Sequence, residues 1–244
     1  DTGTVTDGRA NSHADVLWSG GHLYVASHLT INDELPAVAG YPSYLYRYSY
    51  NATTKTYSLD SGFPVVINNY KTETLVIDRD STGTLWATWQ QDNKIYINRT
   101  LNGDDHVWGT PFQLPVSATD VTVDDNSAVI AFGGNKIGVM WSNQTSANDA
   151  MWFAVHVDGQ SDTTWQAART AIQGPNTADD HINLMRRQAD GSGRVLAAVK
   201  ASFSAPGSAP LIFLLVRDAQ TGDWSSTVFG RVDEADAIHD PQTV

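Results

Sequence analysis

Short apolar segments separated by turns rich in Gly, Asp and Asn recur along the chain in four copies. The copies begin near His13, Thr72, Asn126 and Asp179. This spacing corresponds to a period of roughly 50 to 60 residues, which is typical of a radial array of small sheets. Alternating and continuous apolar runs outnumber those at helical spacing. The pattern therefore predicts an all-β chain built from repeated antiparallel sheets.

Each copy is expected to hold an inner strand, a tight hairpin turn and two further strands before its outer strand. The inner strands are predicted at 15–18, 74–77, 128–131 and 181–184, followed by turns at 20–21, 80–83, 133–135 and 190–193. The second strands are predicted at 23–26, 85–89, 137–141 and 195–199, and the third at 44–48, 94–97, 151–155 and 211–215. The turn residues favour positive φ, as hairpins require.

A large aromatic residue is expected to open each outer strand. Tyr57, Trp108, Trp165 and Trp224 hold matching places in the four copies. The simplest interpretation is that each ring fills the wedge between neighbouring sheets.

These elements predict a β-propeller of four complete four-stranded blades in a single domain, 1–244. The blades are placed at about 13–67, 72–116, 126–173 and 179–232, and 233–244 resembles the start of a fifth blade. The chain could thus be a small closed ring or part of a larger one. Because an unpaired blade edge invites strand addition, we expect more polypeptide, a second chain or self-association to complete the ring.

Composition excludes several classes of function. A net charge of −12 and a single basic pair, Arg186-Arg187, argue against a nucleic-acid partner. No cysteine is present, so disulfides and thiolate metal sites are excluded. No apolar run approaches the length of about 18 residues that a membrane helix needs, so no membrane insertion is expected. The abundance of Thr, Ser, Asn, Gly and Trp favours a secreted, extracellular protein.

Polar and ionisable residues gather where the inner strands start, and loops converge there on the central funnel of a propeller. They are His13 and Asp15; Lys71 and Glu73; Asp124, Asp125 and Asn126; Asp179, Asp180 and His181; and His239 and Asp240. Two interpretations stay open. In the first, these residues only make turn hydrogen bonds, for which Asp and Asn are favoured at loop ends. In the second, the funnel is a functional site.

A functional funnel could support two reactions. A glycoside hydrolase needs two carboxylates about 5 to 9.5 Å apart, and Glu73, Asp125 and Asp180 are the candidates. A polysaccharide lyase needs a base such as His or Tyr and a cation that neutralises the substrate carboxylate. We select His13, Glu73, Asp125, Asp180 and His181 as candidate catalytic residues, and Tyr70, Lys71, Arg186, His239 and Asp240 as candidate substrate-binding residues.

No cofactor is expected. Asp and His would suit Ca²⁺ or another divalent cation, but no compact ligand motif is present. The chain also lacks a Gly-x-Ser-x-Gly elbow and any phosphate-binding or dinucleotide-binding loop, which sets serine hydrolases and nucleotide enzymes aside.

Residues 78–86 resemble the Asp-box turn of sialidase-type propellers, in which an Asp and a Gly form a tight turn before an aromatic residue. Here the turn has one extra residue between Asp80 and Gly83, and it follows the first strand of its blade instead of the third. The wider repeat resembles the sialidase-like superfamily of secreted bacterial propellers, which implies a carbohydrate ligand. The arginine triad that a sialidase would imply does not recur at the inner-strand starts.

Together these features predict a secreted β-propeller that binds or degrades an extracellular polysaccharide through its central funnel. The alternative is a non-catalytic scaffold, adhesion or protein-interaction module, in which the same residues are only structural.

Overall fold

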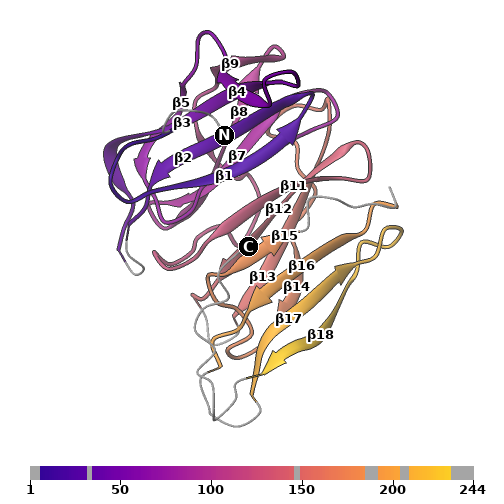
Figure 1. The fold of residues 1–244 in the computed structure, drawn as a ribbon. Helices are drawn as coiled ribbons and strands as arrows, with labels where there is room; N and C mark the ends of the chain where they lie inside the picture. The colour runs from indigo at the N-terminus through magenta and orange to yellow at the C-terminus, as the bar shows by residue number, and fades with distance from the viewer. Residues whose placement is uncertain (1–5, 32–34, 146–148, 185–191, 204–208, 232–244) are drawn as a thin grey trace.

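The computed structural model describes residues 6–31, 35–145, 149–184, 192–203 and 209–231, and all regular structure in these ranges is β-strand. The strands form four antiparallel sheets, which follow one another around a central axis (Figure 1). The predicted four-bladed β-propeller is confirmed. Residues 233–244, the predicted start of a further blade, lie outside the described residues.

In each blade the strands are arranged in chain order, from the inner strand to the outer edge. Blade 1 holds β1 (Ser12–Ser19), β2 (His22–Leu29), β3 (Val38–Asn51), β4 (Thr56–Leu59) and β5 (Val65–Lys71). Blade 2 holds β6 (Val76–Arg79), β7 (Leu85–Gln91), β8 (Lys94–Leu101), β9 (Asp104–Trp108) and β10 (Phe112–Gln113). Blade 3 holds β11 (Ser127–Phe132), β12 (Lys136–Asn143), β13 (Ala150–Val157) and β14 (Arg169–Gln173). Blade 4 holds β15 (Ile182–Leu184), β16 (Val195–Lys200), β17 (Pro210–Arg217) and β18 (Trp224–Arg231).

The outer position differs from the prediction in blades 1 and 2, where it is divided between two short strands. Both β4 and β5 pair with β3, and both β9 and β10 pair with β8. A proline lies in each break, Pro64 in blade 1 and Pro111 in blade 2. Because proline cannot donate a ladder hydrogen bond, it interrupts a continuous outer strand.

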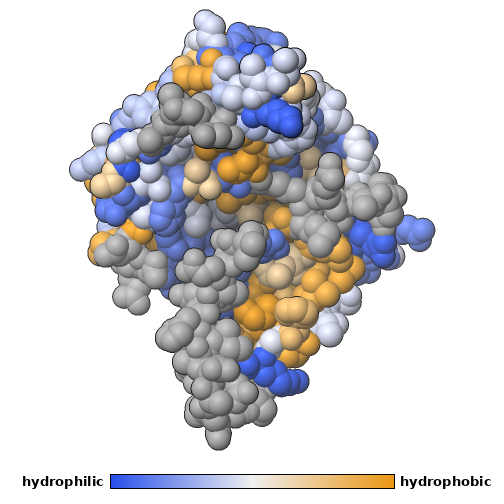
Figure 2. All heavy atoms as spheres, viewed as in Figure 1, coloured by the Kyte–Doolittle hydropathy of each residue, from blue (hydrophilic) through white to orange (hydrophobic). Residues whose placement is uncertain are grey.

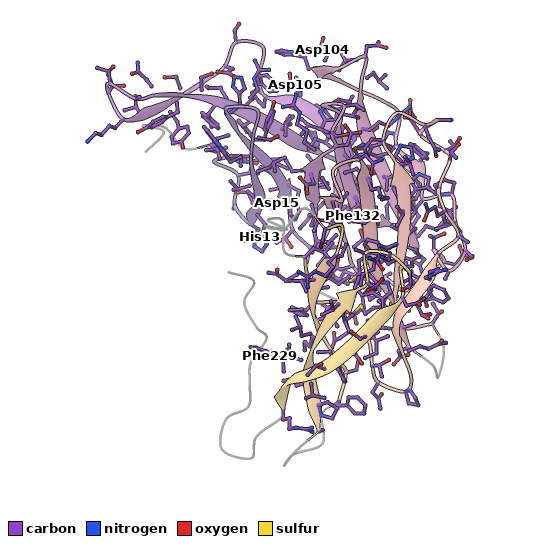
Figure 3. The ribbon with its side chains drawn as sticks, turned by 90° about the vertical axis from the view of Figure 1, so that its right-hand side faces the viewer. His13, Asp15, Asp104, Asp105, Phe132 and Phe229 are labelled. Atoms are coloured by element: carbon purple, nitrogen blue, oxygen red, sulfur yellow. The ribbon has the colours of Figure 1, made fainter. Side chains whose placement is uncertain are left out.

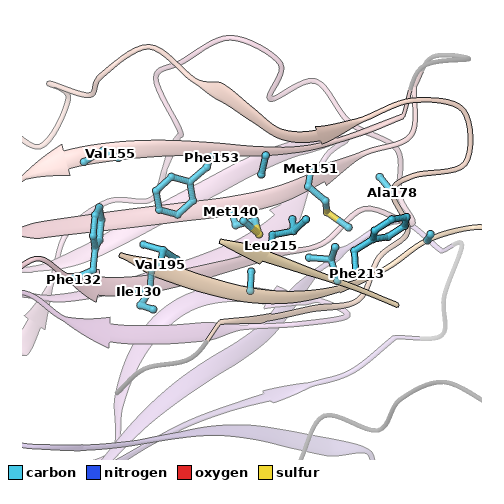
Figure 4. Packing of buried hydrophobic residues seen from close by; sticks show 14 residues of the cluster. Ile130, Phe132, Met140, Met151, Phe153, Val155, Ala178, Val195, Phe213 and Leu215 are labelled. Carbon is cyan, nitrogen blue, oxygen red and sulfur yellow. The ribbon is translucent and has the colours of Figure 1, made fainter. Parts of the chain in front are cut away.

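The hydrophobic core consists of three clusters, one between each pair of successive blades. Figure 4 shows the cluster between blades 3 and 4, where Phe132, Phe153 and Phe213 are buried. Trp108, Trp165 and Trp224 pack against the three clusters in turn, so the wedge-filling role predicted for them is confirmed.

The prediction was wrong in two details of the aromatic repeat. Only Trp224 opens its outer strand, because Trp108 ends β9 and Trp165 precedes β14. In addition, the ring contacts of Tyr57 are with Trp18 and Tyr50 of its own sheet, at centroid distances of 6.4 and 4.9 Å. Tyr57 therefore packs within blade 1 instead of between blades.

Carboxylates on two inner strands tie blade 1 to blade 2 and blade 2 to blade 3. Asp15 Oδ2 accepts the backbone N–H of Ile77 at 2.9 Å, and Asp78 Oδ2 accepts that of Ala131 at 2.8 Å. Both bonds join strands that are far apart in sequence. They fix the inner strands that surround the funnel.

The turn that resembles an Asp-box is held by its own aspartate. Asp80 Oδ1 accepts the backbone N–H groups of Thr82 and Thr84, both at 2.9 Å, and Asp80 Oδ2 accepts Trp86 Nε1–H at 2.9 Å. Gly83 has a φ of 93°, which an L side chain rarely adopts. The turn is thus a local anchor for the blade core and lies apart from the funnel.

The first and last blades expose apolar side chains. Val16 and Trp18 are 51% and 53% exposed on blade 1, and Leu214 and Phe229 are 38% and 79% exposed on blade 4. Figure 2 shows apolar surface over blade 4. Among the described residues there is no helix of the length and apolarity that crossing a membrane requires.

Candidate functional site

A hollow of about 630 Å³ lies where the four inner strands meet. Blade 1 contributes His13, Asp15 and His28, blade 2 contributes Glu73, blade 3 contributes Ala128 and Val129, and blade 4 contributes 182–184. Figure 3 shows His13 and Asp15 on the inner strand of blade 1. The hollow is the central funnel of the propeller.

Two histidines face each other across the first hairpin of blade 1. His13 pairs with His28 in the β1–β2 ladder, and their ring centroids are 6.1 Å apart. His28 Nε2 donates to the backbone oxygen of Glu73 at 3.0 Å, while its buried Nδ1 has no hydrogen-bond partner. Burial lowers the pKa of His28 to about 4. His28 is therefore neutral at pH 7, whereas His13 lies closer to solvent.

Glu73 is held by residues of two other blades. Its Oε1 accepts Asn126 Nδ2–H at 2.7 Å, and Asn126 Oδ1 in turn accepts the Thr74 hydroxyl at 2.8 Å. One carboxylate oxygen each of Glu73, Asp124 and Asp180 lies within 4.8 Å of the others. Carboxylates from blades 2, 3 and 4 thus converge at one point. Such a set either shares protons or suits a hard divalent cation such as Ca²⁺.

The two aspartates before β15 differ in proton affinity. Burial raises the pKa of Asp179 to about 6, and its hydrogen bond with Asp180 acts in the same direction. Burial also opposes ionisation of Asp180, but hydrogen bonds from His181 and Asp179 outweigh it, so the pKa of Asp180 lies well below its usual range. Lys200 Nζ lies 3.5 Å from Asp179 Oδ2. Near neutral pH this pair holds one ionised carboxylate beside one that can carry a proton.

The other sequence-predicted residues lie away from this convergence or outside the described chain. Asp125 is fully buried, and its Oδ2 accepts the backbone N–H and hydroxyl of Thr122 at 2.7 and 3.0 Å. Tyr70 and Lys71 lie on β5, at the outer edge of blade 1. Arg186, His239 and Asp240 are outside the described residues.

His28 was not predicted from the sequence, and Asp124 and Asp179 were named at their strand starts without either being selected as a catalytic residue. His28 could have been found from the Gly20-Gly21 turn. In a hairpin with a two-residue turn, residues at equal distances before and after the turn pair with each other, which places His28 opposite His13. Asp124 stood beside Asp125 at the same strand start. Sequence spacing alone does not indicate which of two adjacent aspartates points inward.

Comparison with solved structures gives the same fold at low sequence identity. The catalytic domain of a GH62 α-L-arabinofuranosidase from Coprinopsis cinerea matches with a TM-score of 0.54 and 11% identity, over 91% of this chain and 70% of that chain. A Hadza microbial sialidase matches with a TM-score of 0.56 and 13% identity, over 90% of this chain and 46% of the sialidase. A GH43 β-1,3-galactosidase with galactodeoxynojirimycin matches with a TM-score of 0.52 and 10% identity, over 89% of this chain and 76% of the galactosidase chain.

At these identities the likeness shows the β-propeller fold alone. No family model and no curated protein sequence matches the chain.

Proposed function

We propose that the chain binds a polysaccharide in its central funnel and hydrolyses a glycosidic bond there. The observation that carries the proposal is the convergence of Glu73, Asp124 and Asp180 from three blades, beside an Asp179 whose pKa is raised to about 6. Glycoside hydrolysis requires a protonated acid and an ionised carboxylate in one site. Glu73 lines the funnel, and Asp179 is adjacent to Asp180, whose carboxylate lies within 4.8 Å of that of Glu73.

Roles follow from these environments. Asp179 is the proton donor, because it remains partly protonated near pH 6. Glu73 lines the hollow directly and is the base or nucleophile, with Asn126 fixing one of its oxygens. His13 also lines the hollow, and its assigned role is to contact the bound sugar. The solved structures of similar fold support this reaction class, because their names describe an arabinofuranosidase, a sialidase and a galactosidase.

The acidic composition of the funnel favours hydrolysis over elimination. A lyase needs a cation near the substrate carboxylate, and among the described residues that line the hollow there is neither an arginine nor a lysine. We also propose that the protein is exported, since its substrate would be an extracellular polysaccharide.

The test is to measure hydrolysis of a panel of neutral and acidic polysaccharides through the release of reducing ends. Glu73→Gln and Asp179→Asn should each lower the rate by about 10² to 10⁴-fold. Asp120→Asn is the matched control, because the Asp120 side chain is 82% exposed and its carboxylate accepts a hydrogen bond from Lys94 Nζ, away from the funnel. The rate should also fall as the pH rises above about 6, where Asp179 loses its proton.

Three other outcomes separate the alternatives. Saccharide binding without any product, weakened by Glu73→Gln, would indicate a non-catalytic lectin-like module. Unsaturated products would indicate a lyase. Neither binding nor turnover on any glycan would favour the scaffold function and reject the proposal.

A further inference from the structure

A second hollow, of about 650 Å³, lies between the outer strands of blades 1 and 2. Its walls come from β5 on one side and from β8 and β9 on the other, and they include Val66, Asn68, Tyr70, Tyr96, Val107 and Trp108. We call this hollow the outer groove. It shares no lining residue with the central funnel.

Apart from its tyrosines, the outer groove has only one ionisable side chain among the described residues of its walls, that of His106, although the chain is acidic. No Lys, Arg, Asp or Glu is among its lining residues, and His106 is bonded through Nδ1 to Asp104 at 2.8 Å. The whole chain, by contrast, has a net charge of −12. Val66 and Val107 are 49% and 44% exposed. His106 is already paired with Asp104, so the walls offer a charged ligand no further charged side chain to compensate for its lost hydration. The groove therefore suits a neutral partner with apolar surface.

Two buried N–H donors in these walls have no acceptor. Asn68 is 3% exposed, and its Oδ1 accepts the backbone N–H of Tyr70 at 2.9 Å, which leaves Nδ2 unpartnered. Trp108 Nε1 is also buried and unpartnered. The equivalent tryptophan of blade 3, Trp165, donates its Nε1–H to the backbone oxygen of Asp162 at 2.9 Å. Trp224 of blade 4 also has a buried, unpartnered Nε1, so the donor that is particular to the outer groove is Asn68 Nδ2.

We propose that the outer groove binds a neutral saccharide residue at a site separate from the funnel. A sugar ring offers a C–H face to tyrosine, tryptophan and valine side chains, and its hydroxyl oxygens accept from N–H donors. Few other neutral ligands combine both features, and sites of this kind pair apolar walls with a small number of oriented polar groups. A second site on the outer surface would hold a polymer chain while the funnel engages another part of it.

The test measures binding of neutral arabino-, galacto- and xylo-oligosaccharides by calorimetry, with oligogalacturonate and an unrelated extended peptide as comparators. Val66→Glu and Val107→Glu place a charge at the groove and should each raise the Kd by at least tenfold. Leu59→Glu is the control, because Leu59 is 45% exposed on β4 of the same blade and does not line the groove; its Kd should stay within twofold. Thermal unfolding of each variant confirms that the fold is kept.

An independent readout is the indole N–H resonance of Trp108, assigned with Trp108→Phe. It should shift when the neutral saccharide is added, and it should shift equally in a Glu73→Gln variant, whose funnel is altered. Loss of all binding in Glu73→Gln, no effect of either groove substitution, or preference for the peptide or for oligogalacturonate would each overturn the proposal. Because funnel turnover is measured separately, failure of the groove site leaves the proposed hydrolysis unaffected.

Discussion

Protonation of the buried His28 imidazole should destabilise the fold as the pH falls. Its pKa is lowered from an ordinary value of 6.5 to about 4, chiefly by burial. The nitrogen that would take the proton is Nδ1, because Nε2 already donates to Glu73, and Nδ1 has no partner to receive a new N–H group. A proton at that position would therefore be a buried, unpaired charge.

The direction in which stability changes with pH follows from the lowered pKa of His28. The unfolded chain binds a proton at His28 more readily than the folded chain does, so stability rises with pH between the two pKa values. The contribution of His28 is complete above pH 6.5 and is lost as the pH falls toward 4. The full effect is about 3 kcal/mol, of which about 2 kcal/mol is lost between pH 7 and pH 5.

Urea unfolding of the wild type and of His28→Gln at pH 7 and pH 5 measures the contribution of His28 to the free energy of unfolding. Glutamine retains an N–H donor for the Glu73 backbone oxygen but does not titrate. All other groups titrate in both proteins, so the wild type should lose about 2 kcal/mol more than the variant over this interval. Equal losses in the two proteins, or a His28 ring titration near pH 6.5 by NMR, would refute the reasoning.

Two further predictions concern the packing of the blades. Asp78→Ala removes the acceptor of the Ala131 N–H and should lower the free energy of unfolding by about 2 kcal/mol, measured by urea titration; Asp120→Ala, at a side chain that is 82% exposed, should change it by less than about 0.5 kcal/mol. Gly138→Ala places a Cβ atom 2.1 Å from Phe153 Cζ, so thermal unfolding should show a loss of about 1 to 3 kcal/mol. Adding Phe153→Leu should make the double variant more stable than the sum of the two single effects predicts, and strict additivity would contradict this account.

The sequence predicted the propeller because the fold depends on local patterns that repeat. Hairpin turns such as Gly20-Gly21 and apolar inner strands such as 128–131 are each specified within a few residues. The three tryptophans could be placed between blades because a large ring at one repeat position has one recurrent space to fill. Tyr57 escaped this reasoning because blade 1 offers it Trp18 and Tyr50 as closer partners.

The site was less predictable because its contacts cross between blades. Glu73 and Asp180 were named from their strand starts, but their approach to Asp124 depends on how three sheets pack. The raised pKa of Asp179 likewise comes from burial and from Asp180, which no pattern in the sequence reports. Side-chain direction at a strand start is set by tertiary packing more than by residue type.

The position of Glu73 links the stability of the fold to the formation of the site. Its backbone oxygen accepts bonds from His28 and Thr30 of blade 1 at 3.0 and 3.2 Å, while its side chain is bonded by Asn126 of blade 3. Glu73 itself precedes the inner strand of blade 2, so three blades must be docked before its carboxylate is fixed. Any change that loosens one blade junction should therefore impair the funnel before it unfolds the sheets. For this reason Asp78→Ala, although it touches no substrate, should reduce turnover at temperatures where circular dichroism still reports intact β-structure. Full turnover up to the global unfolding temperature would show instead that the site forms within a single blade.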